Sequence, residues 1–312
     1  MASVPGATRE VILQRTLQGR VAGLLAERGI VALLFLSASV AVITTVAIFL
    51  TLILNGWEFF RAVPLGEFLF GTTWAPDFLP RHFGSVPLLK GTLQIGLGAV
   101  VIGVPLGIGS AVYLSEFASP RARSILKPAI ELLAGIPSII FGVVALFVIS
   151  PIMSAAFGTP IFTAANATIA LGFMVLPIIT TLAEDALRAV PRELREGALA
   201  LGATKWETTR GVVLPAAASG ITAAIILGFS RAIGETMVVV LAAGLRPTLS
   251  LSYFEESQTI TAFIANRASG DLPTGSVEYL ALFAIGLVLF IITFVINAVA
   301  ATLLARQRRK YA

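Results

Sequence analysis

Six long stretches of apolar residues run along the chain, and polar residues gather in the segments between them. Because a helix rises about 1.5 Å per residue, stretches of this length can cross a hydrocarbon layer about 30 Å thick. They lack the alternation that the short strands of a membrane barrel require. The fourth stretch is the shortest, and we expect it to extend toward Val190, which would bury Glu184 and Asp185 at least partly. The pattern predicts six membrane-spanning helices, at residues 30–54, 91–114, 128–153, 167–183, 216–244 and 279–304.

The segments between these helices complete the predicted organisation. Residues 1–29 are expected to form a cytoplasmic N-terminal segment, and residues 305–312 a basic cytoplasmic tail. Residues 55–87 are predicted to form an extracytoplasmic loop. Residues 88–304 would then form a five-helix core that includes a cytoplasmic loop at residues 191–215.

The basic residues are distributed unevenly between the two sets of connecting segments. Most of them precede the first span, follow the last span, or lie between spans two and three and between spans four and five. Cytoplasmic loops of membrane proteins carry an excess of lysine and arginine. The asymmetry therefore predicts that both termini are cytoplasmic.

Composition excludes a soluble globular enzyme. Charged residues make up only 12% of the 312 residues, whereas soluble domains carry about 25%. The chain has no cysteine and a single histidine, His82, which excludes thiolate chemistry and multi-histidine metal sites. It also lacks the GxxxxGK[ST] loop that would cradle the phosphates of a nucleotide. We expect no catalytic residue, cofactor, metal or nucleic-acid partner.

The polar segment between the fourth and fifth spans carries the strongest motif. It reads EGALALGATKWETTRGVVLP. We expect two short helices that meet at Gly202, because glycine adopts a left-handed turn readily, and Pro215 suits the first turn of the next helix. The result would be a helical knob able to dock in a groove of another protein, the alternative being a solvated charged loop. The residues assigned to this knob are Glu196, Gly197, Ala198, Gly202, Leu214 and Pro215.

Two charged residues lie within the fifth predicted span. Arg231 and Glu235 are four positions apart and therefore share one face of a helix. A charge near the middle of a membrane is unfavourable by about 2.5–3.5 kcal/mol, so such residues face an aqueous path or a partner helix. We assign them, with the adjacent Thr236, to the substrate pathway. The alternative is a structural ion pair between helices.

The third predicted span contains a polar irregularity, AGIPSIIFG. Pro137 lacks a backbone donor and so leaves a carbonyl group without its helical partner. Irregular backbone at membrane depth is tolerated where it is buried in protein or lines a cavity. Pro137 and Ser138 are therefore further candidates for the substrate pathway, and a simple proline kink is the alternative.

With these residues in view, the sequence resembles the permease subunits of binding-protein-dependent ABC importers. The segment from Glu196 to Pro215 is similar to their signature E-A-A-x3-G-x9-I-x-L-P, with Gly197 in place of the first alanine and Val212 in place of the isoleucine. The stretches GFSRAIGETMVVV, IPSIIFG and ALFAIGLVLFIITFVINAVA are similar to the phosphate branch of that family, of the PstC type.

The resemblance implies an all-α polytopic membrane protein with six transmembrane helices and the type I, MetI-like permease fold, in the inner membrane of a bacterial cell. It implies a heterodimer with a sister permease of the PstA type, embedded in membrane lipid. Two copies of a cytoplasmic ABC ATPase would hydrolyse ATP, and an extracytoplasmic phosphate-binding protein would deliver the substrate. The chain itself would be a transport subunit and not an enzyme.

Other functions stay open at this point. Within the same class, the chain could serve another oxyanion or a phosphonate. From a different class, a secondary transporter or channel would need no ATPase, but it would leave the motif from Glu196 to Pro215 unexplained. A phosphate-sensing scaffold is compatible with transport.

Overall fold

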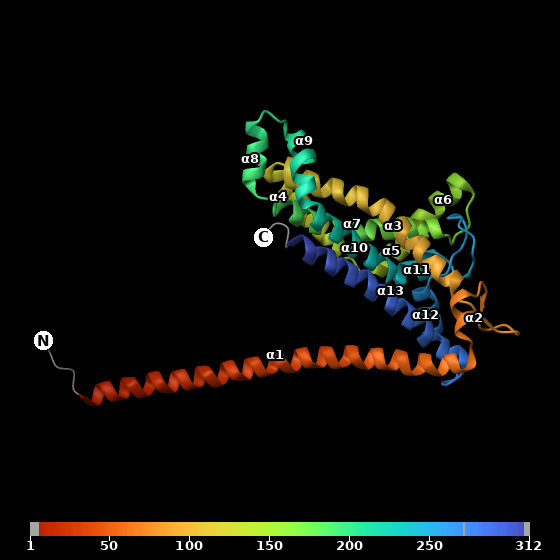
Figure 1. Ribbon diagram of the computed structural model, residues 1–312, viewed down its shortest axis with the longest axis horizontal. Helices are drawn as coiled ribbons and strands as arrows, with labels where there is room; N and C mark the ends of the chain where they lie inside the picture. The colour runs from red at the N-terminus through yellow and green to blue at the C-terminus, as the bar shows by residue number, and fades with distance from the viewer. Residues whose placement is uncertain (1–5, 271, 309–312) are drawn as a thin grey trace. The chain divides into compact units, whose positions relative to one another are not determined.

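The computed structural model describes residues 6–270 and 272–308, almost all of them in helices (Figure 1). The chain divides into two units, with the boundary between Leu54 and Asn55. The first unit contains most of helix α1 (Gly6–Ala62), whose described side chains up to residue 54 are largely exposed and apolar. The elements that carry the candidate sites all belong to the second unit.

Helix α1 continues past the predicted end of the first span at residue 54. The predicted start of a loop at residue 55 is therefore wrong, and the helix ends only at Ala62. The physical reason is Pro64, because the residue before a proline is disfavoured in helical conformation. After this break follow α2 (Leu65–Phe70) and a two-stranded antiparallel hairpin of β1 (Trp74–Ala75) and β2 (His82–Phe83).

An aromatic cluster gives this first connecting segment a fixed structure. The rings of Phe59, Phe68 and Phe83 lie edge to face, with the centroid of Phe59 5.4 Å from that of Phe68 and 5.3 Å from that of Phe83. Trp74 joins them and is only 4% exposed, whereas Trp57 is 65% exposed. Burial of several aromatic side chains explains why the segment is ordered.

Six helical stretches among the described residues are long and apolar enough to cross a membrane, as the hydropathy pattern predicts. The centre of the second unit is a bundle of three long helices, α3, α7 and α10. Small residues let α3 and α7 approach closely: a Cβ atom on Gly107 would lie only 2.8 Å from Cγ2 of Ile179. The three helices are α3 (Val86–Val112), which the π-turn η1 (Tyr113–Phe117) extends, α7 (Ala164–Arg188) and α10 (Leu214–Ile233). Helix α13 (Val277–Arg308) packs against α10.

The third predicted span begins later than expected. Residues 120–134 form a separate helix, α4 (Pro120–Ala134), with Ser119 as its N-cap. The crossing stretch starts at Ser138, because Gly135 and Pro137 interrupt the helix between them. This stretch consists of α5 (Ser138–Val144), the π-turn η2 (Ala145–Ile149) and α6 (Ser150–Phe157).

The fifth predicted span is also interrupted. Helix α10 ends at Ile233, and a short helix, α11 (Met237–Ala242), follows after a break at residues 234–236. The chain then turns at Gly244, which has φ +89°. It runs without regular structure to α12 (Ile260–Ala268), the short helix that leads to α13.

The polar segment between the fourth and fifth spans forms α8 (Arg192–Ala200), α9 (Lys205–Thr208) and the π-turn η3 (Thr209–Val213). Figure 1 shows α8 and α9 at one end of the second unit, with α4 beside them. At the other end lie α2, α6 and α12. The two candidate sites are the knob, residues 191–215, and the interruption between α10 and α11.

Candidate functional site

The interruption between α10 and α11 is built around one buried carboxylate. The side chain of Glu235 is 3% exposed, and its Oε1 accepts hydrogen bonds from the backbone N–H groups of Met237 and Val238, at 3.2 and 3.5 Å. These N–H groups begin α11 and have no partner within the helix. Glu235 therefore stabilises the start of α11, where a negative charge is favourable. The sequence placed it in the middle of a continuous helix, and that placement is wrong.

Arg231 lies in the last turn of α10 and faces the same break. Its Nη1 is paired with Oε2 of Glu235, while 43% of its side chain is exposed. A guanidinium group carries five N–H donors. Since this pair is the only bond that the described residues provide to Arg231, most of its donors are available to a ligand. The two residues are therefore paired across the end of α10, and their assignment to the substrate pathway stays a prediction.

The first turn of α12 and the segment before it connect this break to α3. The hydroxyl of Thr261 donates to the backbone oxygen of Glu235 at 2.6 Å. Nearby, the backbone N–H of Ile260 donates to Oγ1 of Thr92, at 3.0 Å, and Nε2 of Gln94 donates to the backbone oxygen of Leu251, at 2.9 Å. These bonds join residues far apart in the sequence and hold the break in a fixed conformation.

Lys90, on the first turns of α3, is a candidate that the sequence motifs missed. Its Nζ is shielded from solvent and has no hydrogen-bond partner among the described residues. The adjacent Gly91 permits this packing, because a Cβ there would lie 2.2 Å from the backbone oxygen of Gln258. Burial of an ammonium group is unfavourable, and the carboxylate of Glu255 offsets this through an electrostatic interaction. A bound anion would stabilise the ammonium further. The only sequence signal was an isolated cation at the start of an apolar span.

The three other residues assigned to the pathway occupy neighbouring elements. Thr236 is half-buried inside the break, with its Oγ1 3.5 Å from the backbone oxygen of Gly234. Pro137 is the exposed N-cap of α5, and Ser138 is half-buried at its first position. Helix α5 packs against α11, but no hydrogen bond in the described part of the chain joins Pro137 or Ser138 to Arg231.

The knob has the geometry that its sequence predicts. Gly202 has φ +87° and connects α8 to α9, as expected from its position in the motif. Thr204 and Glu207 form a capping box at the start of α9, with Oγ1 of Thr204 accepting from the Glu207 N–H at 3.3 Å. Pro215 is in the first turn of α10, directly after the π-turn η3, which continues the helix from α9.

The tip of the knob exposes apolar side chains. Leu201 is 91% exposed and Trp206 is 55% exposed, although both lie on a polar segment. Of the residues assigned from the motif, Glu196 and Gly197 are exposed on α8, Ala198 and Leu214 are half-buried, and Pro215 is exposed. Exposed aromatic and aliphatic side chains on a small protrusion are typical of a surface that binds another protein.

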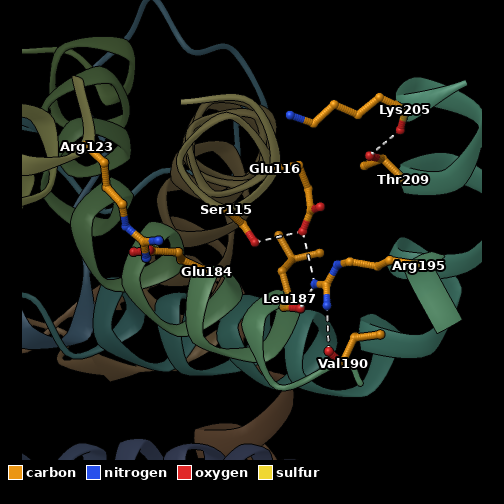
Figure 2. Close-up of polar contacts among 9 residues, drawn as sticks. All are labelled: Ser115, Glu116, Arg123, Glu184, Leu187, Val190, Arg195, Lys205 and Thr209. Atoms are coloured by element: carbon orange, nitrogen blue, oxygen red, sulfur yellow. Dashed lines mark hydrogen bonds and ion pairs between the residues drawn. The ribbon is translucent and has the colours of Figure 1, made fainter. Parts of the chain in front are cut away.

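The root of the knob is held by Arg195, a residue that the motif did not single out. Its guanidinium donates to the backbone oxygens of Leu187 and Val190, at 2.7 and 2.6 Å, and to Oε1 of Glu116, at 3.1 Å (Figure 2). Glu116 in turn accepts from the hydroxyl of Ser115, at 2.8 Å. The side chain of Arg195 is only 19% exposed. These bonds join α8 to the end of α7 and to η1.

A second ion cluster joins α4 to α7. Glu184 is 1% exposed and is paired with Arg123, as Figure 2 shows. Its other oxygen lies 3.2 Å from Nζ of Lys127. The predicted burial of Glu184 is confirmed, whereas Asp185 is largely exposed. The extension of the fourth span to Arg188 therefore places a carboxylate where two cations of α4 neutralise it.

Comparison with known proteins gives a consistent picture. Residues 103–310 match the family of binding-protein-dependent transport system inner membrane components. The chain is 36% identical over 281 residues to the probable ABC transporter permease protein YqgH of Bacillus subtilis, which covers 89% of this chain and 88% of that protein. It is 38% identical over 266 residues to the phosphate transport system permease protein PstC of Mesorhizobium japonicum, which covers 77% and 78%. The PstC protein of Haemophilus influenzae is 32% identical over 297 residues, covering 88% and 91%.

Solved structures share the fold. The inward-facing MetNI methionine ABC transporter matches with a TM-score of 0.53 and 20% identity, over 72% of this chain and 94% of that one. A bacterial ABC transporter involved in the import of the acidic polysaccharide alginate matches with a TM-score of 0.53 and 17% identity, over 71% and 79%. At these identities the likeness supports the arrangement of helices and nothing about the substrate.

Proposed function

Since the chain belongs to the family of binding-protein-dependent transport system inner membrane components, we propose that it is the phosphate-conducting permease subunit of an ATP-driven importer. Its six apolar helical stretches fit a multi-pass protein of the cell membrane. The relatives named PstC give the substrate class. The alternative is a permease for another oxyanion or for a phosphonate, and the uptake experiment below distinguishes it from a phosphate permease.

The observation that carries this proposal is the half-exposed guanidinium of Arg231 at a break in a membrane helix. Arginine stays charged at physiological pH, and its planar fork matches the oxygens of phosphate. One oxygen of Glu235 accepts from the first N–H groups of α11, and the other is paired with Nη1 of Arg231. The carboxylate therefore orients Arg231 while the remaining N–H donors of the guanidinium stay available to a ligand. Broken helices at membrane depth form the substrate sites of other transporters. Thr236, Pro137 and Ser138 complete the proposed pathway on the neighbouring elements.

The orientation of the chain follows from its basic residues. The end that carries α4, α8 and α9 is rich in arginine and lysine, so we place it in the cytoplasm together with both termini. Reporter fusions after Lys127 and after Lys205 should then report a cytoplasmic position. Fusions after Arg81 and after Gly270 should report the opposite side, and a reversed result would contradict the orientation.

The knob is the proposed docking site of the ATPase. Its exposed tip, Leu201 and Trp206, would insert into a groove of that partner, and Arg195 would transmit the movement to α7. A sister permease of the PstA type would complete the pathway, two ATPase copies would bind the two knobs, and an extracytoplasmic phosphate-binding protein would dock opposite. Membrane lipid would cover the remaining apolar surface. ATP hydrolysis is assigned to the partner because no nucleotide-binding loop is present in this sequence.

The test is uptake of radiolabelled phosphate by proteoliposomes that contain the chain, its sister permease and the ATPase. We expect uptake that needs both internal ATP and the external binding protein. Unlabelled phosphate should compete, and sulfate or a phosphonate should not. Phosphate flux through the chain alone without ATP would overturn the proposal in favour of a channel or secondary transporter. Better competition by another oxyanion would overturn the substrate class alone.

A further inference from the structure

A cavity of about 460 Å³ opens at the root of the knob. Residues of η1, α4, α7 and α8 line it, and the charged ones are four arginines and two glutamates. Figure 2 shows that Arg195 and Glu116 face one another on one part of this region, with Arg123 on another. The charged lining residues are Arg123, Arg188, Arg192, Arg195, Glu116 and Glu196.

Two of the four arginines are fixed by the protein itself. Arg195 binds Glu116 and two backbone oxygens, and Arg123 is paired with the buried Glu184. Their side chains are only 19% and 24% exposed, so these guanidinium groups keep their positions whether or not a ligand is present. One of the two lining carboxylates, Glu116, is thereby already used.

The other two arginines have no such partner. Arg188, the last residue of α7, and Arg192, the first residue of α8, make no hydrogen bond or ion pair with any residue that the structure describes. Both are exposed at the edge of the cavity. Two unpaired cations, Arg188 and Arg192, and one uncommitted carboxylate, Glu196, therefore share a small space in which the other charges are already paired. Such an excess of positive charge attracts an anion with several oxygen acceptors.

We propose that this cavity binds a phosphate group through Arg188 and Arg192. Guanidinium groups bind phosphate oxygens in bidentate geometry, and two of them on adjacent helices can hold different oxygens of one group. The group belongs either to inorganic phosphate or to the headgroup of an anionic lipid, because both present the same oxygens. This site is separate from the break at Arg231, which lies on α10.

Occupation of the cavity would link α7 to α8. The loop between these helices contains only residues 189–191, and Arg195 already ties it to Leu187 and Val190. A phosphate group bound between Arg188 and Arg192 would add a contact across the same loop and make the knob harder to displace. The consequence for transport rests on the proposed function, whereas the binding itself does not.

The test uses the complex of the chain with its sister permease and ATPase, purified without nucleotide. Equilibrium binding of radiolabelled phosphate is compared between the wild type and the double variant Arg188→Gln/Arg192→Gln. The matched control is Arg61→Gln/Arg121→Gln, which removes two exposed arginines that lie outside the knob and do not line the cavity. We expect a saturable component that weakens at least tenfold in the first variant and is unchanged in the control.

A second measurement identifies the source of the phosphate group. Native mass spectrometry of the complex taken from phosphatidylglycerol nanodiscs should show a retained lipid if the ligand is a headgroup. That adduct should then be lost in the Arg188→Gln/Arg192→Gln variant and kept in the control. Either a phosphate component or a lipid adduct that depends on these two arginines supports the proposal.

Two results would overturn it. In the first, neither inorganic phosphate binding nor lipid retention differs between the double variant and the control. In the second, the double variant loses the ATPase during purification, which would show that these arginines pair with acidic residues of that subunit instead. Phosphate uptake by proteoliposomes that contain the wild-type complex is measured in parallel. Absence of uptake there would contradict the proposed function, whereas the two results above contradict only the binding site.

Discussion

Arg195 and Arg231 have the same side chain but use it in opposite ways. Arg195 is 19% exposed and donates to two backbone oxygens and a carboxylate, so its role is to hold the root of the knob. Arg231 is 43% exposed and has one partner, Glu235, among the residues that the structure describes. The number of donors that the protein itself occupies therefore separates an arginine that maintains structure from one that is available to a ligand.

The first prediction tests the ligand-binding side of this comparison and has the largest expected effect. Arg231→Gln removes the fork that would hold phosphate and leaves the buried Glu235 without its cation. Loss of two charge-assisted hydrogen bonds corresponds to about 3 kcal/mol, so phosphate uptake should fall about 100-fold or more. The measurement is uptake by reconstituted vesicles, with ATPase association checked by co-purification. Arg121→Gln, which removes an exposed arginine of α4 outside the knob, is the matched control.

Arg231→Lys sharpens the same prediction. The lysine keeps the positive charge beside Glu235 but cannot bind two phosphate oxygens as a fork. We expect normal assembly with uptake reduced about tenfold or more, because the charge-assisted bidentate contact is lost. Full uptake by this variant would indicate that Arg231 serves only as a structural partner of Glu235.

The second prediction tests the structural arginine. Arg195→Met should leave Glu116 without its cation and remove one donor from each of two backbone oxygens, which is unfavourable by about 3 kcal/mol in a partly buried site. The knob would then lose its fixed position. We expect co-purification of the ATPase, and with it uptake, to fall about tenfold, while phosphate still competes with unchanged affinity. A change in the apparent KM for phosphate with normal ATPase association would contradict the separation of roles.

The third prediction concerns the turn inside the knob. Gly202 has φ +87°, a conformation that a β-branched residue adopts only with strain of about 1–2 kcal/mol or more. Space is not the obstacle, since a Cβ at this position would meet no atom within 4 Å. Gly202→Val should therefore weaken ATPase association several-fold, whereas Gly197→Ala, on the exposed face of α8, should not. ATP hydrolysis coupled to the binding protein is the second measurement.

The smallest effect on phosphate uptake is expected from a substitution of Lys90. Like Arg231, Lys90 has N–H donors that the described residues do not use. Its Nζ is buried without a hydrogen-bond partner in the described part of the chain. If it receives phosphate on the way to Arg231, Lys90→Met should raise the apparent KM for uptake about threefold at unchanged maximal rate, equivalent to less than 1 kcal/mol. A drop in the amount of inserted protein instead would assign Lys90 to folding.

The sequence predicts the knob better than it predicts the interrupted spans. Gly202 and Pro215 act through their own backbone and near neighbours, so their spacing is enough to predict two short helices followed by the fifth span. The break before α11 depends on Thr261, which binds the backbone oxygen of Glu235 from 26 positions away. Because hydropathy stays high through this break, the pattern of apolar residues does not indicate it.

The sequence of the third span contains a signal for its interruption, but that signal is not enough to predict a separate helix. Gly135 and Pro137 mark the interruption, yet a proline in an apolar stretch is equally compatible with a kinked continuous helix. The separation of α4 depends on its contact with α7, where Arg123 and Lys127 meet Glu184. In the sequence, Arg188 and Arg192 contribute only to the charge asymmetry that predicts the orientation of the chain. Their shared environment is a property of the folded chain.

The exposed tip of the knob has a consequence for how the cell handles this subunit before assembly. Leu201 and Trp206 extend into water on a surface where apolar groups invite non-specific contacts. A copy synthesised without its ATPase would present this tip to chaperones and proteases, which remove incompletely assembled proteins. Masking by the partner would then determine how long the subunit survives. Expression of the two genes in balance would set the amount of transporter in the membrane.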